Sequence, residues 1–167
     1  MSDYEDFAQE FKIITDREME VSSLNERIII QKIAYLLFNM IGKDFQYNEF
    51  TWYLHGVFCW ELWRDALNQG TPSPELARLD TPILTNLDYI KKDFVQSGLT
   101  NYFFNVEDLE LITTVLYSAR ERRGQDELYE DNSDLITHVM ALKNKFDEKR
   151  VRDSITIIKK IKWNFNQ

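Results

Sequence analysis

Residues 23–67 decide the fold; they read SLNERIIIQKIAYLLFNMIG (23–42), KDFQYNEFTWYLHG (43–56) and VFCWELWRDAL (57–67). Ser23 and Glu26 have the spacing of a capping box, in which the serine oxygen accepts the backbone N–H of Glu26 and the glutamate reaches back. Apolar residues then recur with helical period up to Gly42, a natural residue after a helix: Ile29, Ile33, Leu36, Leu37 and Met40. This pattern predicts the central helix, and further apolar side chains widen its stripe beyond one face: Ile30, Tyr35 and Phe38.

A strand is predicted next, because apolar residues alternate with Thr51, Tyr53 and His55: Phe50, Trp52 and Leu54. The alternation predicts that the face carrying Phe50, Trp52 and Leu54 is buried. Phe45 and Tyr47 form either a partner strand or an extended lead-in. Gly56 ends the strand, and a short helix follows with apolar residues at helical spacing: Trp60, Trp63 and Leu67.

The rest of the chain carries helical patterns. Residues 1–21 form an acidic lead-in with a predicted helix over residues 4–18, in which three apolar residues have helical spacing: Phe7, Phe11 and Ile14. Thr71-Pro72-Ser73-Pro74 predicts an exposed turn. A helix capped by Thr81 with Pro82 in its first turn ends at Gly98, and its stripe is Ile83, Leu87, Ile90 and Phe94.

Three more helices complete the prediction. Asn105 caps the first, which ends at Gly124 and has the inward residues Leu109, Ile112, Leu116 and Ala119. The polar residues 120–131 predict a loop. Ser133 begins a helix with Leu135, Val139 and Leu142 inward, and Asp147 caps the last, with Val151, Ile155, Ile158 and Ile161 inward.

These elements predict a mostly α (α+β) fold: one domain over residues 1–167, with about seven helices and a small strand or hairpin near residues 45–55. The domain begins with the acidic lead-in (1–21) and ends with a basic C-terminal helix (143–167). With 44% hydrophobic and 29% charged residues the chain suits a globular domain. The longest apolar run, residues 33–38, is too short for a membrane span. The acidic N-terminus does not fit a signal or transit peptide, so we expect a cytoplasmic protein without membrane contact.

The single cysteine, Cys59, excludes an intrachain disulfide, and the two histidines, His55 and His138, lie too far apart in sequence for a known zinc motif. We therefore expect no metal and no cofactor. The net charge is −8, but residues 143–167 hold eight basic and three acidic residues, which gives +5 there and −13 elsewhere. An acidic body disfavours phosphate binding, whereas the basic end could contact nucleic acid or an acidic partner, or be a solvated helix face.

Several segments of the chain resemble a known family. Residues 30–37 (IQKIAYLL) are similar to the LQKLxYLL helix of small prokaryotic proteins of the YwgA-like and Panacea (SocA-type antitoxin) group. Residues 50–56 (FTWYLHG) resemble their aromatic strand, residues 60–65 (WELWRD) stand where their next helix begins, and residues 134–138 (DLITH) are similar to a late segment. Where the family has Gly-Pro-aromatic-Ser, this chain has Gly56-Val57-Phe58-Cys59, without the proline and with a weaker helix cap.

The resemblance implies a mostly helical fold, no known catalytic activity and, from the Panacea-type members, binding to another protein as an antitoxin or as an adaptor that hands a toxin to a protease. The sequence thus predicts a non-enzymatic protein-binding regulator whose partner is a toxin, a protease or a host factor, with a homodimer compatible. An acidic, aromatic-rich surface would bind the partner, because partly exposed tryptophans are typical binding hot spots. Its candidate residues are Gln31, Lys32, Tyr53, His55, Gly56, Phe58 and Trp60.

Two alternatives stay open. The order helix, strand, turn and helix also fits a winged-helix-like DNA-binding regulator, with phosphate contacts from Lys149, Arg150, Arg152, Lys159, Lys160 and Lys162. An enzyme of unrecognised type would need Cys59 as a nucleophile at a helix N-terminus and His55 as its base. The acids at the start of the helix after Asn105 need no chemistry, because the helix dipole favours them there: Glu107, Asp108 and Glu110.

Overall fold

The structure is a computed structural model, and it describes residues 2–72, 79–122 and 128–165. In these residues the predicted mostly α class is confirmed, because seven α-helices and one 3₁₀ helix accompany a single two-stranded antiparallel sheet. The elements are α1 (Asp3–Thr15), α2 (Leu24–Ile41), β1 (Thr51–Tyr53), β2 (Gly56–Phe58), α3 (Trp60–Gln69), α4 (Thr81–Ser97), η1 (Leu99–Tyr102), α5 (Val106–Arg122), α7 (Ser133–Leu142) and α8 (Glu148–Ile158).

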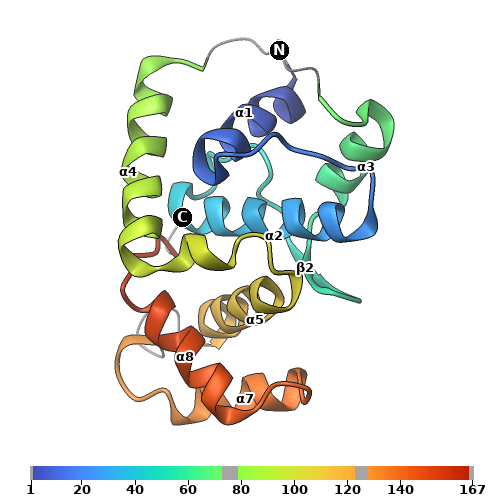
Figure 1. The fold of residues 1–167 in the computed structure, drawn as a ribbon. Helices are drawn as coiled ribbons and strands as arrows, with labels where there is room; N and C mark the ends of the chain where they lie inside the picture. The colour runs from blue at the N-terminus through green and yellow to red at the C-terminus, as the bar shows by residue number, and fades with distance from the viewer. Residues whose placement is uncertain (1, 73–78, 123–127, 166–167) are drawn as a thin grey trace.

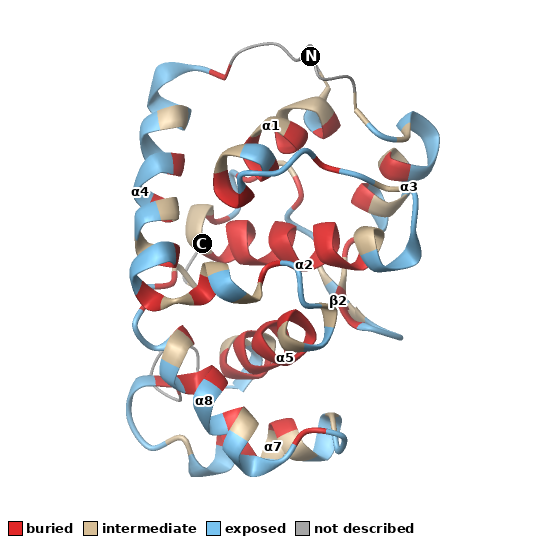
Figure 2. Ribbon diagram, in the orientation of Figure 1, coloured by how far each residue is buried: buried red, intermediate tan, exposed pale blue. Residues whose placement is uncertain are grey.

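Helix α2 is the central element of the fold (Figure 1). The predicted capping box is present: Ser23 Oγ accepts the N–H of Glu26 at 3.1 Å, and a Glu26 carboxylate oxygen accepts the N–H of Ser23 at 2.9 Å. Every residue from Ile28 to Asn39 is buried, so this helix is covered on all sides (Figure 2). An unbroken buried run of this length explains why its sequence is apolar beyond one stripe.

Helix α5 is the second buried helix and packs directly against α2. The Asn105 side chain caps it as predicted by accepting the N–H of Asp108 at 3.0 Å. Helices α1 and α3 pack on α2, with α4 against α1, and helices α7 and α8 pack on α5 (Figure 1). The core is therefore two stacked central helices between two groups of outer helices.

Both ends of the described chain dock on this core. Phe7 and Phe11 of α1 are fully buried, so the acidic lead-in contributes an apolar face to the fold. At the other end Trp163 is buried, its indole N–H donates to the Ile158 carbonyl at 2.9 Å, and the Asn164 N–H donates to the Asn39 carbonyl of α2 at 2.7 Å. These contacts bring the C-terminal segment back to the central helix.

The sheet differs from the predicted hairpin near residues 45–55. Strand β1 pairs with β2, so that Trp52 lies opposite Val57 and Tyr53 opposite Gly56. Phe45 and Tyr47 are buried but belong to no strand, and Leu54 lies in the turn with 76% of its surface exposed. The prediction of a buried Leu54 is wrong because the chain reverses there, which ends the alternation of the strand.

Several helix boundaries also differ from the prediction. Helix α5 runs to Arg122, so the predicted loop over 120–131 is wrong at its start. Gly124, the predicted end of this helix, lies outside the described residues, and so do Ser73 and Pro74 of the predicted turn. The residue that precedes α4 is Asp80 rather than Thr81. Helix α8 covers only part of the predicted basic C-terminal helix (143–167). Two residues expected to face inward are exposed, Ile83 and Leu142.

Candidate functional site

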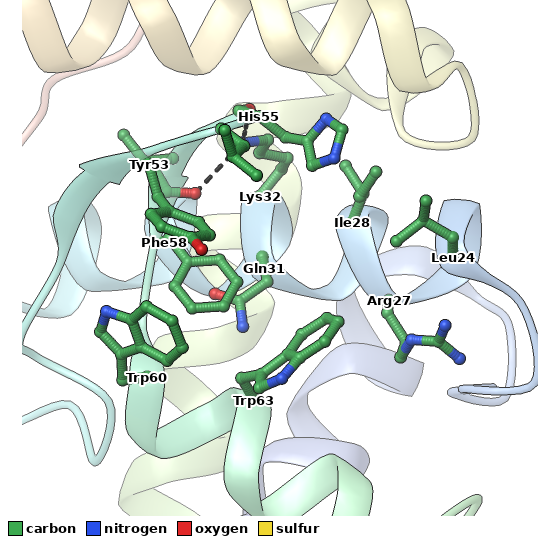
Figure 3. A pocket seen from close by; sticks show the side chains of 12 residues that line it. Leu24, Arg27, Ile28, Gln31, Lys32, Tyr53, His55, Phe58, Trp60 and Trp63 are labelled. Carbon is green, nitrogen blue, oxygen red and sulfur yellow. Dashed lines mark hydrogen bonds between the residues drawn. The ribbon is translucent and has the colours of Figure 1, made fainter.

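A pocket of about 260 Å³ opens where the start of α2, the β1–β2 hairpin and the start of α3 meet (Figure 3). Most of its wall is apolar or aromatic. Its lining residues are Leu24, Arg27, Ile28, Gln31, Lys32, Tyr53, Leu54, His55, Val57, Phe58, Trp60 and Trp63. All the predicted protein-binding residues except Gly56 are in this set, so residues that the sequence places 29 positions apart share one site.

Gln31 joins the central helix to the end of the hairpin. Its side-chain N–H donates to the Cys59 carbonyl at 3.1 Å, and its side-chain oxygen accepts the Cys59 N–H at 2.8 Å. Both backbone groups of Cys59 are thereby satisfied inside the protein, where unpaired polar groups are costly. The bonds hold the junction between β2 and α3 against α2.

Lys32 joins the same helix to the turn of the hairpin. It is only 1% exposed, and its ammonium group donates to the Val57 carbonyl at 3.1 Å and to the His55 carbonyl (Figure 3). Burial lowers the pKa of Lys32 to about 7; the carboxylate of Glu110 opposes this shift and the ammonium of Lys143 adds to it. Lys32 therefore acts as a buried clamp across the turn.

Gly56 lies between the two carbonyls that Lys32 binds. Its φ of +96° is a conformation that residues with a Cβ rarely adopt. A Cβ there would also lie 3.2 Å from the Lys32 ammonium nitrogen. The glycine thus permits both the turn and the close approach of the lysine, although it does not itself line the pocket.

Four aromatic side chains form a connected group at the pocket. The Phe58 ring centroid lies 5.2 Å from Tyr53, 4.7 Å from Trp60 and 5.5 Å from Trp63. Trp60 is 48% exposed and Tyr53 44% exposed. This agrees with the partly exposed aromatic surface that the sequence suggested.

The two residues of the enzyme hypothesis lie in different environments. Cys59 is buried, and burial raises the pKa of its thiol, although nearby backbone N–H groups of α3 oppose the shift. His55 is exposed, and the structure records no hydrogen bond between the two side chains. Within the described residues no group of three His, Cys, Asp or Glu side chains could hold a metal ion. The described helices also include none long and apolar enough to cross a membrane.

Half of the predicted nucleic-acid-binding residues are engaged in ion pairs. Arg150 binds Glu107 at 3.2 Å and Asp108 at 3.0 Å, while Lys149 and Arg152 pair with acids one turn away on α8, Asp153 and Glu148. The three lysines that follow α8 are exposed: Lys159, Lys160 and Lys162. Glu107 and Asp108 at the start of α5 thus have a partner on α8 in addition to the helix dipole.

Six of the pocket residues were not among the predicted ones: Leu24, Arg27, Ile28, Leu54, Val57 and Trp63. The sequence held a signal for three of them, Leu24, Arg27 and Ile28. Residues four apart share a helix face, and this spacing relates Leu24 and Ile28 to the predicted Lys32 and relates Arg27 to the predicted Gln31. Leu54 and Val57 depend on where the chain reverses, which local patterns did not show.

No protein family, no curated protein and no solved structure matches this chain. The resemblance of residues 30–37 and 50–56 to the YwgA-like and Panacea group accordingly stays a prediction.

Proposed function

We propose that this chain is a non-enzymatic protein-binding regulator and that the pocket between α2, the hairpin and α3 contacts its partner. The observation that carries this proposal is the exposure of Trp60 and Tyr53 beside an aromatic pocket on the surface of the fold. Tryptophan and tyrosine are enriched among the residues that dominate protein–protein binding energy, and they do so mainly where they can bury apolar area in a pocket.

The scaffold of the pocket supports this role because it is fixed before any partner arrives. Gln31 and Lys32 hold the hairpin and the start of α3 to the buried helix α2 through four hydrogen bonds. A site that is already ordered loses less conformational entropy on binding, which leaves more of the contact energy for affinity.

Three further apolar side chains with high exposure add to this surface. Leu24 at the start of α2 and Leu54 in the turn line the pocket, and Leu67 lies on α3, two helical turns after Trp60. Exposed apolar side chains that gather in one region are typical of interaction sites. The resemblance suggests that the partner is a toxin, a protease or a host factor and that the action is antitoxin-like or adaptor-like; a homodimer would use the same surface.

The alternatives have less support. A buried thiol whose pKa is raised by burial is a poor nucleophile, which argues against Cys59 chemistry. The basic segment has fewer cations open to phosphate than the sequence suggested, because Lys149, Arg150 and Arg152 are ion-paired.

The test is an affinity pull-down from native lysate with three baits: the wild-type chain, Trp60→Ala, and the charge-reversed variant with Lys159, Lys160 and Lys162 changed to Glu. We expect one protein at near-stoichiometric yield on the wild type and the charge-reversed bait, and its loss on Trp60→Ala. Nucleic acid on the wild type that is lost with the charge-reversed bait would instead favour the DNA-binding alternative.

A further inference from the structure

Resting on the proposed function, we infer that the pocket binds an acidic peptide segment of the partner: one large apolar side chain enters it, and carboxylates beside that side chain contact Arg27 and His55. The pocket, its charges and an unsatisfied donor in its wall each support this choice of occupant.

The polar groups of the pocket are complementary to carboxylates. Besides the buried Lys32, the lining contains two basic side chains, Arg27 and His55, and it contains no aspartate or glutamate, unlike the acidic surface that the sequence predicted. This is notable in a chain with 28 acidic and 20 basic residues and a net charge of −8. A partner with acidic groups around its apolar anchor would find donors here, whereas a basic partner would find no acid in the pocket wall.

Arg27 has donors that the fold does not use. One of its terminal nitrogens donates to the Val21 carbonyl at 2.8 Å, and its guanidinium carbon lies 5.6 Å from the centroid of the Trp63 ring. Its Nε is buried and has no hydrogen-bond partner, and no carboxylate of the described residues forms an ion pair with this side chain. The structure also records no hydrogen bond from the second terminal nitrogen of Arg27 to any described residue, so a carboxylate supplied by the partner could bind there without breaking a contact within the fold.

His55 is placed to act together with Arg27. Figure 3 shows the His55 ring beside Ile28, on the same side of the pocket as Arg27 and Leu24. The backbone carbonyl of His55 is held by Lys32, while its side chain is exposed. The two donors therefore flank the apolar start of α2, and an acid on each side of an inserted apolar residue could reach one of them.

The dimensions favour a peptide over a small metabolite. The volume of about 260 Å³ is below the roughly 300–1,000 Å³ of typical small-molecule sites and suits a single large side chain. Exposed apolar side chains at the mouth, Leu24, Tyr53, Leu54 and Trp60, provide further contact area along an extended segment. Short segments anchored by one or a few side chains are a common mode of peptide recognition.

The test begins with a random-peptide display library selected on the wild-type chain, from which peptides that also bind Trp60→Ala are removed. We expect the remaining peptides to share an aromatic or large aliphatic residue with Asp or Glu within two positions. Peptides in which Lys and Arg replace the acids, or in which no charge is enriched, would overturn the inference while leaving the proposed function standing. If no selected peptide depends on Trp60, the inference fails and the proposed function loses its contact site.

A double-mutant cycle then assigns the contact. A selected peptide, blocked at both ends, and its Glu→Gln or Asp→Asn analogue are titrated onto the wild type, Arg27→Gln and the control Lys92→Gln, an exposed residue of α4 outside the pocket. We expect Arg27→Gln to lower the affinity for the acidic peptide about tenfold and the affinity for the neutral analogue by less than about twofold. Lys92→Gln should bind both peptides like the wild type. Equal weakening of both peptides would show a structural effect of Arg27 and overturn the assignment.

Discussion

Lys32 links the fold to the site at the level of a single residue. Among the lysines and arginines of the described residues, Lys32 alone is buried, and its two hydrogen bonds go to the backbone carbonyls on either side of Gly56. A lysine that is nearly fully buried loses hydration, which disfavours its charged form and lowers its pKa. The neutral amine retains two donors, enough for the His55 and Val57 carbonyls.

This burial predicts a specific pH dependence of stability. The pKa of Lys32 is about 7 in the folded protein against 10.5 in the unfolded chain. Between these values the unfolded chain binds a proton that the folded protein does not, so the contribution of Lys32 to the free energy of unfolding rises with pH; below pH 7 both states are protonated and it is constant. Lys32→Met removes this contribution.

The measurement is urea unfolding of the wild type and Lys32→Met between pH 6 and 8.5. We expect the difference in unfolding free energy to shift in favour of the wild type by about 1 kcal/mol per pH unit above pH 7, because one pKa unit corresponds to 1.36 kcal/mol. Taking the difference cancels the titration of other groups, and Lys92→Met serves as the exposed control. A difference that does not change with pH would show that Lys32 keeps its proton in the folded state.

At the scale of elements, the hairpin is the part of the fold on which the site depends. Strands of three residues have few ladder hydrogen bonds of their own, so β1 and β2 rely on the side chains of α2 for their position. The same two strands and their turn supply Tyr53, His55 and Phe58 to the pocket. Changes that loosen the hairpin should consequently affect the pocket before the rest of the fold.

Two glycines with positive φ allow this to be tested. Gly56 has a φ of +96°, and a Cβ added there would meet the Lys32 amine at 3.2 Å, whereas Gly70 after α3 has a φ of +67° and an added Cβ would meet no atom within 4 Å. Gly70 combines this φ with a ψ of −158°, a conformation that is nearly restricted to glycine, so we expect Gly70→Ala to cost about 1–3 kcal/mol of unfolding free energy through backbone strain alone. Gly56→Ala should cost about 1–2 kcal/mol more than Gly70→Ala, because strain is combined with displacement of the lysine clamp.

Thermal or urea unfolding measures both costs, and hydrogen exchange of the amides in residues 51–58 locates them. Faster exchange in that segment for Gly56→Ala, but not for Gly70→Ala, is the expected pattern. Equal costs with unchanged exchange in the hairpin would mean that Lys32 does not clamp the turn.

The elements that the sequence predicted well are those with local causes. The start of α2 follows from Ser23 and Glu26, and the cap of α5 from Asn105, because each capping bond joins residues three apart. The partner of β1 was not predictable in this way: pairing with Gly56–Phe58 requires a reversal at Leu54 and His55, and the alternating pattern gave no sign of it. Lys32 was a candidate site residue, but its burial depends on carbonyls 23 and 25 positions away.

At the scale of the whole molecule, the uneven charge of the chain is partly neutralised within the fold. Glu110 of α5 is buried and binds Lys143 at 2.6 Å and Lys145 at 2.7 Å. Arg150 of α8 binds Glu107 and Asp108. The basic end of the sequence thus joins α8 and the loop before it to the acidic start of α5, and it is not a separate charged tail over the described residues.

Glu110 is the strongest of these links. Burial alone would raise the pKa of its carboxyl, but the ammonium groups of Lys143 and Lys145 hold it below its usual value, so its contribution to stability is present at neutral pH and is lost on acidification. Glu110→Gln leaves the largely buried Lys143 without its counterion and should cost about 1–3 kcal/mol in urea unfolding at pH 7.

The matched control is Glu148→Gln, which breaks an exposed pair with Arg152 and should change stability by less than about 0.5 kcal/mol. Equal effects of the two substitutions would show that Glu110 does not hold α5 to the C-terminal part of the chain.

The role of the pocket as the contact site is tested most directly by the affinity of the purified partner for three forms of this protein: wild type, Trp60→Ala and Tyr89→Ala. Tyr89 is an aromatic residue of α4 that is 72% exposed and lies outside the pocket, so it controls for the loss of an exposed ring. If the pocket is the contact site, calorimetry should show at least about a 30-fold loss of affinity for Trp60→Ala, with Tyr89→Ala binding like the wild type. A partner that binds Trp60→Ala as tightly as the wild type would contradict the assignment of the pocket as the contact site.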